Sequence, residues 1–234
     1  MEYILVSDYD KTFYLDDNDI EKNKMYLKKF QGEGNIFILA TGRSYFDFKK
    51  VVSKYKIDYD FAIINHGATI LDKYDNILYN SHIDNNILSS LILDLKLSKT
   101  NNYFFCSNLE SRVSPNHDDI SKINVEYNNE EITEEIKEYI SNKYSSYINS
   151  YIIGPTKIEI VSKNSSKLQA IKFLEKNNNY NKDRIYVIGD GNSDIEMVDY
   201  YNGYCMENSI DELKRVANKD YSSVSILISD ILNK

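Results

Sequence analysis

Residues 3–12 read YILVSDYDKT, a short apolar run that leads directly into two carboxylates. The run from Tyr3 to Ser7 is rich in aliphatic residues and closed by polar ones, which is typical of a central strand of a parallel sheet. Asp8 and Asp10 follow and are two residues apart, so their side chains project the same way. Because ligands collect at the carboxyl ends of strands in open α/β sheets, we expect a site here.

Further apolar runs continue this pattern. Residues 36–40 and 61–65 are predicted strands, residues 19–30 and 44–55 are predicted helices, and Asp17 or Asn18 is the expected cap of the first helix, with Gly32 and Gly34 ending it. This β-α-β-α-β series predicts an α/β fold with a Rossmann-like, doubly wound, mostly parallel sheet. A hairpin at 68–79 follows, in which residues 68–71 and 77–79 pair.

Residues 81–161 interrupt the pattern and are expected to form an inserted α+β cap domain, between a first core segment at 1–80 and a second at 162–234. The insert mixes predicted helices at 84–97 and 133–144 with strands at 103–106, 148–153 and 157–161. The doubly wound pattern then resumes with helices at 166–176, 193–200 and 224–232 and strands at 184–188 and 203–206, and the Asn-rich residues 177–181 are expected to form a loop.

Composition excludes several classes of function. The 28 basic and 36 acidic residues give a net charge of −8, which argues against nucleic-acid and anionic-membrane partners. The two cysteines, Cys106 and Cys205, are far apart and have no metal-ligand spacing, and the chain start lacks the pattern of a signal peptide. We therefore expect a cytoplasmic protein.

Two more predicted strand ends carry polar residues. Thr41 and Gly42 follow one, and Asp190 follows another. Neighbouring carboxylates repel one another unless a cation intervenes, and Mg²⁺ prefers hard oxygen ligands together with water and phosphate. The sequence therefore predicts a magnesium site at which Asp8, Asp10 and Asp190 meet.

This arrangement predicts phosphoryl transfer. Asp8 would attack phosphorus to form an aspartyl-phosphate, and Asp10 would protonate the leaving alcohol and then activate water. The Thr41 hydroxyl and the Gly42 amide would bind the phosphoryl oxygens, and Lys167 would add positive charge. Taken singly, each motif has a plainer interpretation: a solvated turn at 8–12, a calcium-binding or simple turn at 189–194, and a solvated lysine at 167.

Four segments resemble, in order and in spacing, the motifs of the haloacid dehalogenase-like superfamily. They are Asp8-x-Asp10-x-Thr12, the 41–43 segment, Lys167 in residues 165–171, and residues 189–197. The position of the insert, together with residues 65–68 (NHGA) and 206–209 (MENS), is similar to the Cof-type sugar-phosphate phosphatase branch.

The resemblance implies a role for each matched residue. Asp8 would be the nucleophile and Asp10 the acid/base. Asp8, Asp190 and the backbone carbonyl of Asp10 would hold Mg²⁺. Asp194, together with Asn192 and Ser193, would support the metal site without binding the ion directly. Two residues depart from the family pattern: Lys11 stands where Gly is usual, and Ser193 stands where the branch usually has Asn.

Other residues have two open interpretations. Arg43 either reaches the substrate or pairs at the surface, and Asn208 either supports the site or closes a loop. Arg112 and His117 are candidates for substrate contact, although a polar surface loop is the default for residues 107–119. The tyrosines of the insert are expected to serve packing, and His66 and His82 lack metal-ligand spacing.

The predicted activity is Mg²⁺-dependent hydrolysis of a small phosphorylated metabolite under a mobile cap. A phosphomutase of the same architecture, a non-catalytic binding protein that retains the fold, and a receiver-like domain phosphorylated on aspartate are the alternatives. Product analysis separates the mutase, a stable aspartyl-phosphate would indicate the receiver, and the presence of all the reactive side chains argues against the binding protein.

Overall fold

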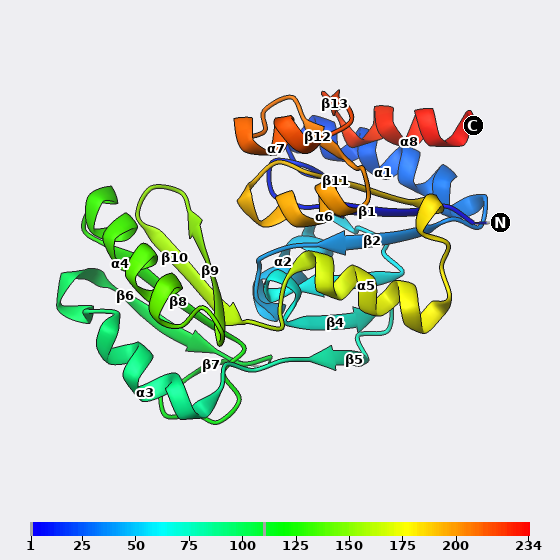
Figure 1. Cartoon of the computed structure of the whole chain (residues 1–234). Helices are drawn as coiled ribbons and strands as arrows, with labels where there is room; N and C mark the ends of the chain where they lie inside the picture. The colour runs from blue at the N-terminus through cyan, green and yellow to red at the C-terminus, as the bar shows by residue number, and fades with distance from the viewer. Residues whose placement is uncertain (1, 110) are drawn as a thin grey trace.

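The computed structural model describes residues 2–109 and 111–234, which form a large and a small lobe (Figure 1). Within these ranges, the large lobe contains a sheet of eight strands in the order β13-β12-β11-β1-β2-β3-β4-β5. Neighbouring strands run parallel except along the β3-β4-β5 edge, which is antiparallel. The predicted doubly wound α/β fold is confirmed. The strands are β1 (Ile4–Asp8), β2 (Ile36–Ala40), β3 (Phe61–Ile64), β4 (Thr69–Asp72), β5 (Ile77–Asn80), β11 (Ile185–Gly189), β12 (Tyr204–Met206) and β13 (Asp220–Tyr221).

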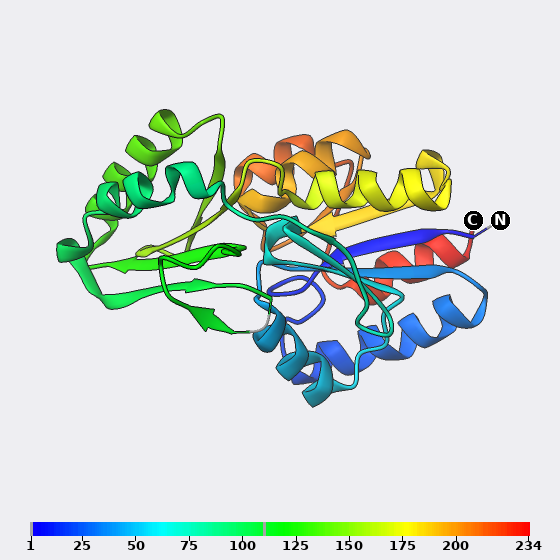
Figure 2. The same ribbon diagram turned by 90° about the horizontal axis from the view of Figure 1, so that it is seen from below.

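Helices cover both faces of this sheet (Figure 2). One face packs on α1 (Asp17–Gly32), α2 (Tyr45–Tyr55) and α8 (Val224–Leu232), and the other on α5 (Lys167–Asn178), α6 (Ile195–Tyr200) and α7 (Asp211–Val216). The central strand β1 supplies Leu5 to the first core and Ile4 and Val6 to the second. Both faces of β1 are therefore apolar, and each such fully buried side chain stabilises the fold by about 1.5–3 kcal/mol.

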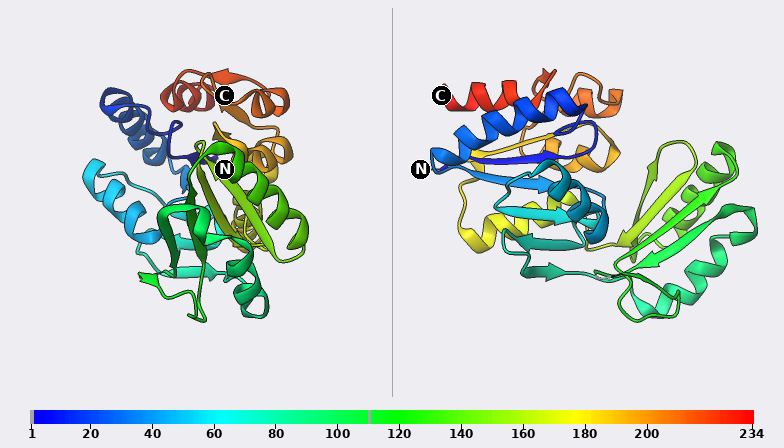
Figure 3. Two further views of the ribbon diagram at one scale, coloured as in Figure 1. Left: turned by 90° about the vertical axis from the view of Figure 1, so that its left-hand side faces the viewer. Right: turned by 180° about the vertical axis from the view of Figure 1, so that it is seen from behind.

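The small lobe is an antiparallel sheet backed by two helices. Among the described residues its order is β7-β6-β8-β10-β9, and α3 and α4 pack on the face that points away from the large lobe (Figure 3). Ile123 of β8 and Ile158 of β10 belong to that core, so the alternate residues Lys122 and Glu159 point toward the large lobe. The elements are α3 (Asn85–Asp94), β6 (Thr100–Ser107), β7 (Arg112–Val113), β8 (Lys122–Tyr127), α4 (Glu130–Lys143), β9 (Ile148–Ile153) and β10 (Lys157–Ser162).

Short 3₁₀ turns complete the chain at Asn65–Gly67, Leu97–Lys99, Lys182–Arg184 and Asn192–Asp194. The lobes are joined by two crossings, near residues 81–84 and 163–166, and both ends of the chain lie at the far end of the large lobe (Figures 1 and 3). In the described ranges, no helix combines the length and the apolar character that a membrane span requires.

Some predicted boundaries differ from the structure. The N-cap of α1 is Asp16, whose carboxylate accepts the amides of Asn18 and Asp19, so the prediction of Asp17 or Asn18 as cap was wrong. The predicted loop at 177–181 begins only at Asn179, which ends α5 in the left-handed conformation. Asn177 and Asn178 continue the helix because each side-chain amide donates to the carbonyl four residues earlier.

Four helices and strands have no counterpart in the predictions: β7, β8, α7 and β13. Strand β8 matters most, because it lies at the centre of the small sheet between β6 and β10. Its sequence, KINVEY, alternates polar and apolar residues as a half-buried strand does.

Candidate active site

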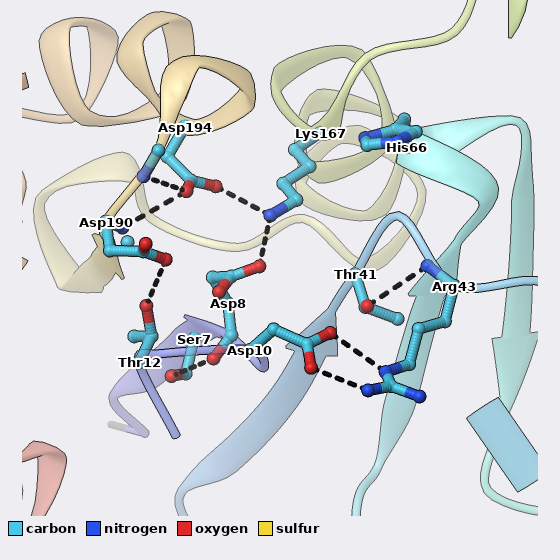
Figure 4. A network of polar contacts seen from close by, with 12 residues as sticks. Ser7, Asp8, Asp10, Thr12, Thr41, Arg43, His66, Lys167, Asp190 and Asp194 are labelled. Atoms are coloured by element: carbon cyan, nitrogen blue, oxygen red, sulfur yellow. Dashed lines mark hydrogen bonds and ion pairs between the residues drawn. The ribbon is translucent and has the colours of Figure 1, made fainter. Parts of the chain in front are cut away.

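The carboxyl ends of β1, β2 and β11 meet at a cavity of about 740 Å³ between the two lobes. Asp8, Thr41 and Asp190 line it from these strand ends, and Lys167 lines it from the start of α5. The small lobe closes the opposite side with residues of β6, β8, β9 and β10. The structure thus brings the predicted nucleophile, phosphate-binding and metal-binding residues to one site (Figure 4).

Asp8 is the last residue of β1 and is 6% exposed. Its Oδ1 accepts a hydrogen bond from Lys167 Nζ at 2.5 Å, whereas its Oδ2 is buried and has no hydrogen-bond partner among the described residues. Lys167 Nζ also donates to Asp194 Oδ1 at 2.6 Å. One oxygen of Asp8 is therefore held in place while the other is left for a further ligand.

The site carries more negative than positive charge. Oxygens of Asp8, Asp190 and Asp194 lie within 4.8 Å of one another, and the ammonium group of Lys167 contacts two of the three carboxylates. Burial, reinforced by Asp194 and Asp190, raises the pKa of Asp8 well above its ordinary value, although Lys167 opposes that shift. Burial and then Asp194 likewise raise the pKa of Asp190. Burial alone would lower the pKa of Lys167, but Asp194 and Asp8 outweigh it and raise the pKa.

The loop after β11 has its shape fixed by Asp194. Its Oδ2 accepts the amides of Asp190 at 3.2 Å and Gly191 at 3.1 Å. A Cβ at Gly189 would lie 2.3 Å from the carboxyl carbon of Asp194, so only glycine fits at the end of this strand. Thr12, buried under the site, donates to Asp190 Oδ1 at 3.0 Å. Asp190 is therefore oriented from two sides.

The donor set fits a hard divalent cation. The clustered groups are all carboxylates, their charge exceeds that of the nearby ammonium group, and Asp8 Oδ2 is a buried oxygen without a partner. Mg²⁺ takes one or two carboxylates and completes its shell with water and phosphate oxygens. Asp8 and Asp190 are the residues that would hold it.

Asp10 and Thr41 lie on the β2 side of the cavity. Arg43 donates from Nε to Asp10 Oδ2 at 2.8 Å and from Nη2 to Asp10 Oδ1 at 2.6 Å, a two-pronged ion pair. Thr41 is buried, and its Oγ1 accepts the amide of Arg43 at 3.1 Å. Of the two interpretations of Arg43, the structure shows pairing, and its partner is the predicted acid/base.

Of the remaining predicted site residues, some line the cavity and others lie outside it. Asn192 and Ser193 line the cavity. Asn208 donates from Nδ2 to the carbonyl of Lys11 at 3.1 Å and closes the 8–12 loop. Arg112 lies over the ring of Phe105 and lines a neighbouring cleft, whereas His117 is exposed and accepts the amide of Asp119.

Lys11 adopts a left-handed conformation, with φ of 63°. Such a φ costs a non-glycine residue about 1–2 kcal/mol, which gives a physical reason for the family's preference for glycine here. The side chain of Lys11 is exposed and lines the cavity. Lys11 therefore places a positive charge at the edge of the cavity.

The sequence predictions missed a polar group on the small lobe. Lys122, Asn124 and Glu159 line the cavity from β8 and β10, and Tyr151 lines it from β9. The ring of Tyr151 stacks on His66 with ring centres 4.5 Å apart. The alternating pattern of β8 was the signal that could have revealed Lys122 and Asn124, whereas the packing of Tyr151 on His66 needs the relative placement of the lobes.

Comparison with known proteins agrees with this geometry. The family model of the haloacid dehalogenase-like hydrolases matches residues 5–118 and 96–225. A Buchnera aphidicola protein named "Putative phosphatase" is 24% identical over a 271-residue alignment that covers 100% of both chains. The structure of TM0651 from Thermotoga maritima superposes with a TM-score of 0.80 at 23% identity, covering 98% of this chain and 97% of that one.

A third relative, BT1666 from Bacteroides thetaiotaomicron, is described among phosphatases of this superfamily. It has a TM-score of 0.81 at 17% identity and covers 100% of this chain and 95% of its own. These likenesses extend over both lobes. Since the family model also matches most of the sequence, this chain belongs to the haloacid dehalogenase-like hydrolases.

Proposed function

We propose that this protein is a Mg²⁺-dependent phosphatase that hydrolyses a small, sugar-phosphate-like metabolite through an aspartyl-phosphate intermediate. One observation carries the proposal: Asp8 lies buried at the cavity floor, with Oδ1 fixed by Lys167 and Oδ2 without a partner among the described residues. The names of the Buchnera and Bacteroides relatives support a phosphatase. A phosphorylated metabolite in the cytoplasm is the matching substrate.

Asp8, Asp190 and the backbone carbonyl of Asp10 are the groups that would bind Mg²⁺. Asp194, Asn192 and Ser193 would support these ligands without binding the ion directly. When bound, the ion neutralises the charge of the phosphate and of the surrounding carboxylates. Thr12 and Asp194 keep Asp190 in place for this role through their hydrogen bonds.

The covalent step belongs to Asp8. Its carboxylate oxygen forms a bond to phosphorus while the bond from phosphorus to the ester oxygen breaks, and the alcohol leaves with a proton from Asp10. Water then attacks phosphorus, Asp10 takes the water proton, and the bond to Asp8 breaks to release inorganic phosphate. Asp10 acts as a carboxylic acid in the first transfer and as a carboxylate in the second, and the ion pair with Arg43, in which both oxygens accept, holds the carboxylate form.

Three further groups receive the phosphoryl oxygens. The Thr41 hydroxyl and the Gly42 amide lie at the end of β2, and Lys167 approaches from the start of α5. Hydrogen-bond donors placed before the reaction stabilise the charge that develops in the transition state. Lys167 also restrains Asp8, so one side chain positions the nucleophile and neutralises the transferred group.

The small lobe acts as the cap that excludes water and contacts the leaving group. Its inner face lines the same cavity as Asp8, with Tyr103, Asn124 and Tyr151 among the lining residues. Closure of such a lobe over a site raises the strength of every electrostatic interaction within it.

The test is Asp8→Asn, assayed for phosphate release from an aryl phosphate and from a panel of phosphorylated metabolites with and without Mg²⁺. We expect the wild type to need Mg²⁺ and the variant to lose at least about 1,000-fold in kcat, with an unchanged circular dichroism spectrum. Turnover by the variant would exclude Asp8 as nucleophile. Formation of a phosphorylated isomer in place of inorganic phosphate would indicate a mutase.

A further inference from the structure

A lysine of the small lobe contacts the phosphate-binding loop of the large lobe. Lys122 is the first residue of β8, and its side chain is 4% exposed. Its Nζ donates to the backbone carbonyl of Gly42 at 2.6 Å and to Glu159 Oε1 at 3.1 Å. A buried ammonium group thus joins the two lobes beside the Thr41–Gly42 segment.

The peptide group that Lys122 contacts is also bonded on its other side. The carbonyl of Gly42 accepts from Lys122, and the N–H of the same peptide, which belongs to Arg43, donates to Thr41 Oγ1 at 3.1 Å. The side chain of Arg43 in turn holds both oxygens of Asp10. Any rotation of this peptide plane would move the Thr41 hydroxyl and the arginine that orients Asp10.

His66 closes the other side of the same loop. A Cβ added at Gly42 would lie 2.3 Å from His66 Cε1, so the ring packs directly on the Gly42 backbone. Nε2 of His66 lies 2.5 Å from Glu159 Oε2, and Tyr151 stacks on the ring. The Gly42 backbone is therefore held by a lysine and by an imidazole that both contact Glu159.

The charges in this group follow from burial. Burial lowers the pKa of His66, so the ring is neutral at pH 7 and donates its Nε2–H to the carboxylate. Burial alone would raise the pKa of Glu159, but Lys122 and His66 outweigh it and lower the pKa to about 2. With His66 neutral, Lys122 supplies the positive charge that the buried carboxylate requires.

We infer that Lys122 is a positioning residue for the reaction: it fixes the Gly42–Arg43 peptide when the small lobe is closed and so orients Thr41 and, through Arg43, Asp10. The inference rests on the proposed function. Lys122 lies outside the large-lobe motifs. In this role it affects the chemical step by the same factor whatever the leaving group is.

Two simpler roles make different predictions. A lysine that only neutralises Glu159 becomes dispensable once that charge is removed. A lysine that binds the leaving group changes KM, and does so by different factors for different substrates. A lysine that positions the peptide lowers kcat by a similar factor for every substrate, because the phosphoryl group is common to all of them.

The experiment compares Lys122→Met, the double variant Lys122→Met with Glu159→Gln, and the control Lys143→Met. Lys143 is also an ion-paired lysine of the small lobe, but it contacts Asp94 on the outer face. For each protein, kcat and KM are measured with an aryl phosphate and with two metabolites that differ in leaving group, and the melting temperature is recorded.

We expect Lys122→Met to lose at least about 10-fold in kcat by the same factor for all three substrates, with KM within about threefold of the wild type. The double variant should regain the melting temperature lost by the single variant, because no unpaired carboxylate remains, and should keep the low kcat. Lys143→Met should behave as the wild type. Recovery of kcat in the double variant, or a change confined to KM, would overturn the inference.

A second measurement does not depend on activity. Amide hydrogen exchange at Arg43 reports the hydrogen bond to Thr41 directly, and we expect it to be at least about 10-fold faster in Lys122→Met and in the double variant, and unchanged in Lys143→Met. If the wild type releases no phosphate from any substrate, the proposed function fails, and unchanged exchange at Arg43 would then separately refute the role of Lys122. If Lys122→Met does not fold, the steady-state kinetics and the amide exchange at Arg43 are both measured on the double variant instead.

Discussion

Arg43 holds both carboxylate oxygens of Asp10, with Nε at 2.8 Å and Nη2 at 2.6 Å. The two bonds lie in the plane of the guanidinium group and therefore fix the direction of the carboxyl group as well as its position. The guanidinium carbon of Arg43 also lies over the ring of Tyr9, 5.3 Å from the ring centre, and this contact restricts the conformations of the arginine side chain. The proposed acid/base is thus oriented by a side chain that is itself held.

Replacing Arg43 should affect proton transfer more than phosphate binding. We expect Arg43→Met to lose about 10- to 100-fold in kcat with alkyl phosphates, which need a protonated leaving group, and much less with aryl phosphates that carry good leaving groups. Steady-state kinetics with a series of leaving groups measures the difference. Arg215→Met, at an exposed position of α7, is the matched control. An equal loss across the series would place Arg43 on the phosphate instead.

A substitution at Thr12 tests the metal site without replacing any of the proposed metal ligands. Its hydroxyl donates to Asp190 Oδ1 at 3.0 Å from a fully buried position. Loss of such an outer contact weakens metal binding by about 10- to 100-fold. We expect Thr12→Val to raise the Mg²⁺ concentration required for half-maximal activity by about this factor.

Thr133→Val is the control for Thr12. Thr133 is also buried and donates to a backbone carbonyl, that of Asn129, but it lies in α4 of the small lobe. Both variants lose one hydrogen bond, which is worth about 1 kcal/mol. Calorimetric titration with Mg²⁺ should separate them, and equal affinities would show that Thr12 does not orient Asp190.

Gly67 is a position at which any side chain should disturb the site. Its φ is 97°, and an added Cβ would lie 2.2 Å from the carbonyl oxygen of Ser166, next to Lys167. We expect Gly67→Ala to destabilise the fold by at least about 1–3 kcal/mol and to displace the start of α5. Gly32→Ala, at the end of α1 with no described atom within 4 Å of the new Cβ, should instead add up to about 1 kcal/mol. Urea unfolding of both variants measures the contrast.

The sequence predicts the large lobe and its site well because parallel strands place their carboxyl ends at one edge. Asp8, Thr41 and Asp190 each follow an apolar run, so their convergence could be predicted without coordinates. The pairing of Arg43 with Asp10 could not, because an arginine side chain of this length reaches either substrate or neighbour. The contact between Lys122 and Gly42 depends on how the two lobes are placed, which no local pattern encodes.

The small lobe shows the same limit within one sheet. Glu159 lies opposite Asn124 on β8 and Tyr151 on β9, a row that depends on the register of two antiparallel pairs. A shift of one residue in either pair would turn Glu159 away from the cavity. Since β8 was not predicted, its register was not predicted either, and Arg112 and His117 were the residues of the small lobe expected to contact the substrate.

Glu159 should make the stability of the protein depend on acid pH. Its pKa lies at about 2, below the ordinary 4.5, so the charged carboxylate contributes stability above pH 4.5 that is lost as the pH falls toward 2. The shift corresponds to a contribution on the order of 3 kcal/mol. Glu159→Gln lacks this titration, so we expect the free energy of unfolding of the wild type to fall more steeply than that of the variant between pH 4.5 and pH 2.

Urea unfolding at several pH values gives both slopes, and comparing slopes cancels the pH-independent cost that the variant incurs by leaving Lys122 without its carboxylate. Parallel slopes would mean that Lys122 and His66 do not hold Glu159 in its charged form.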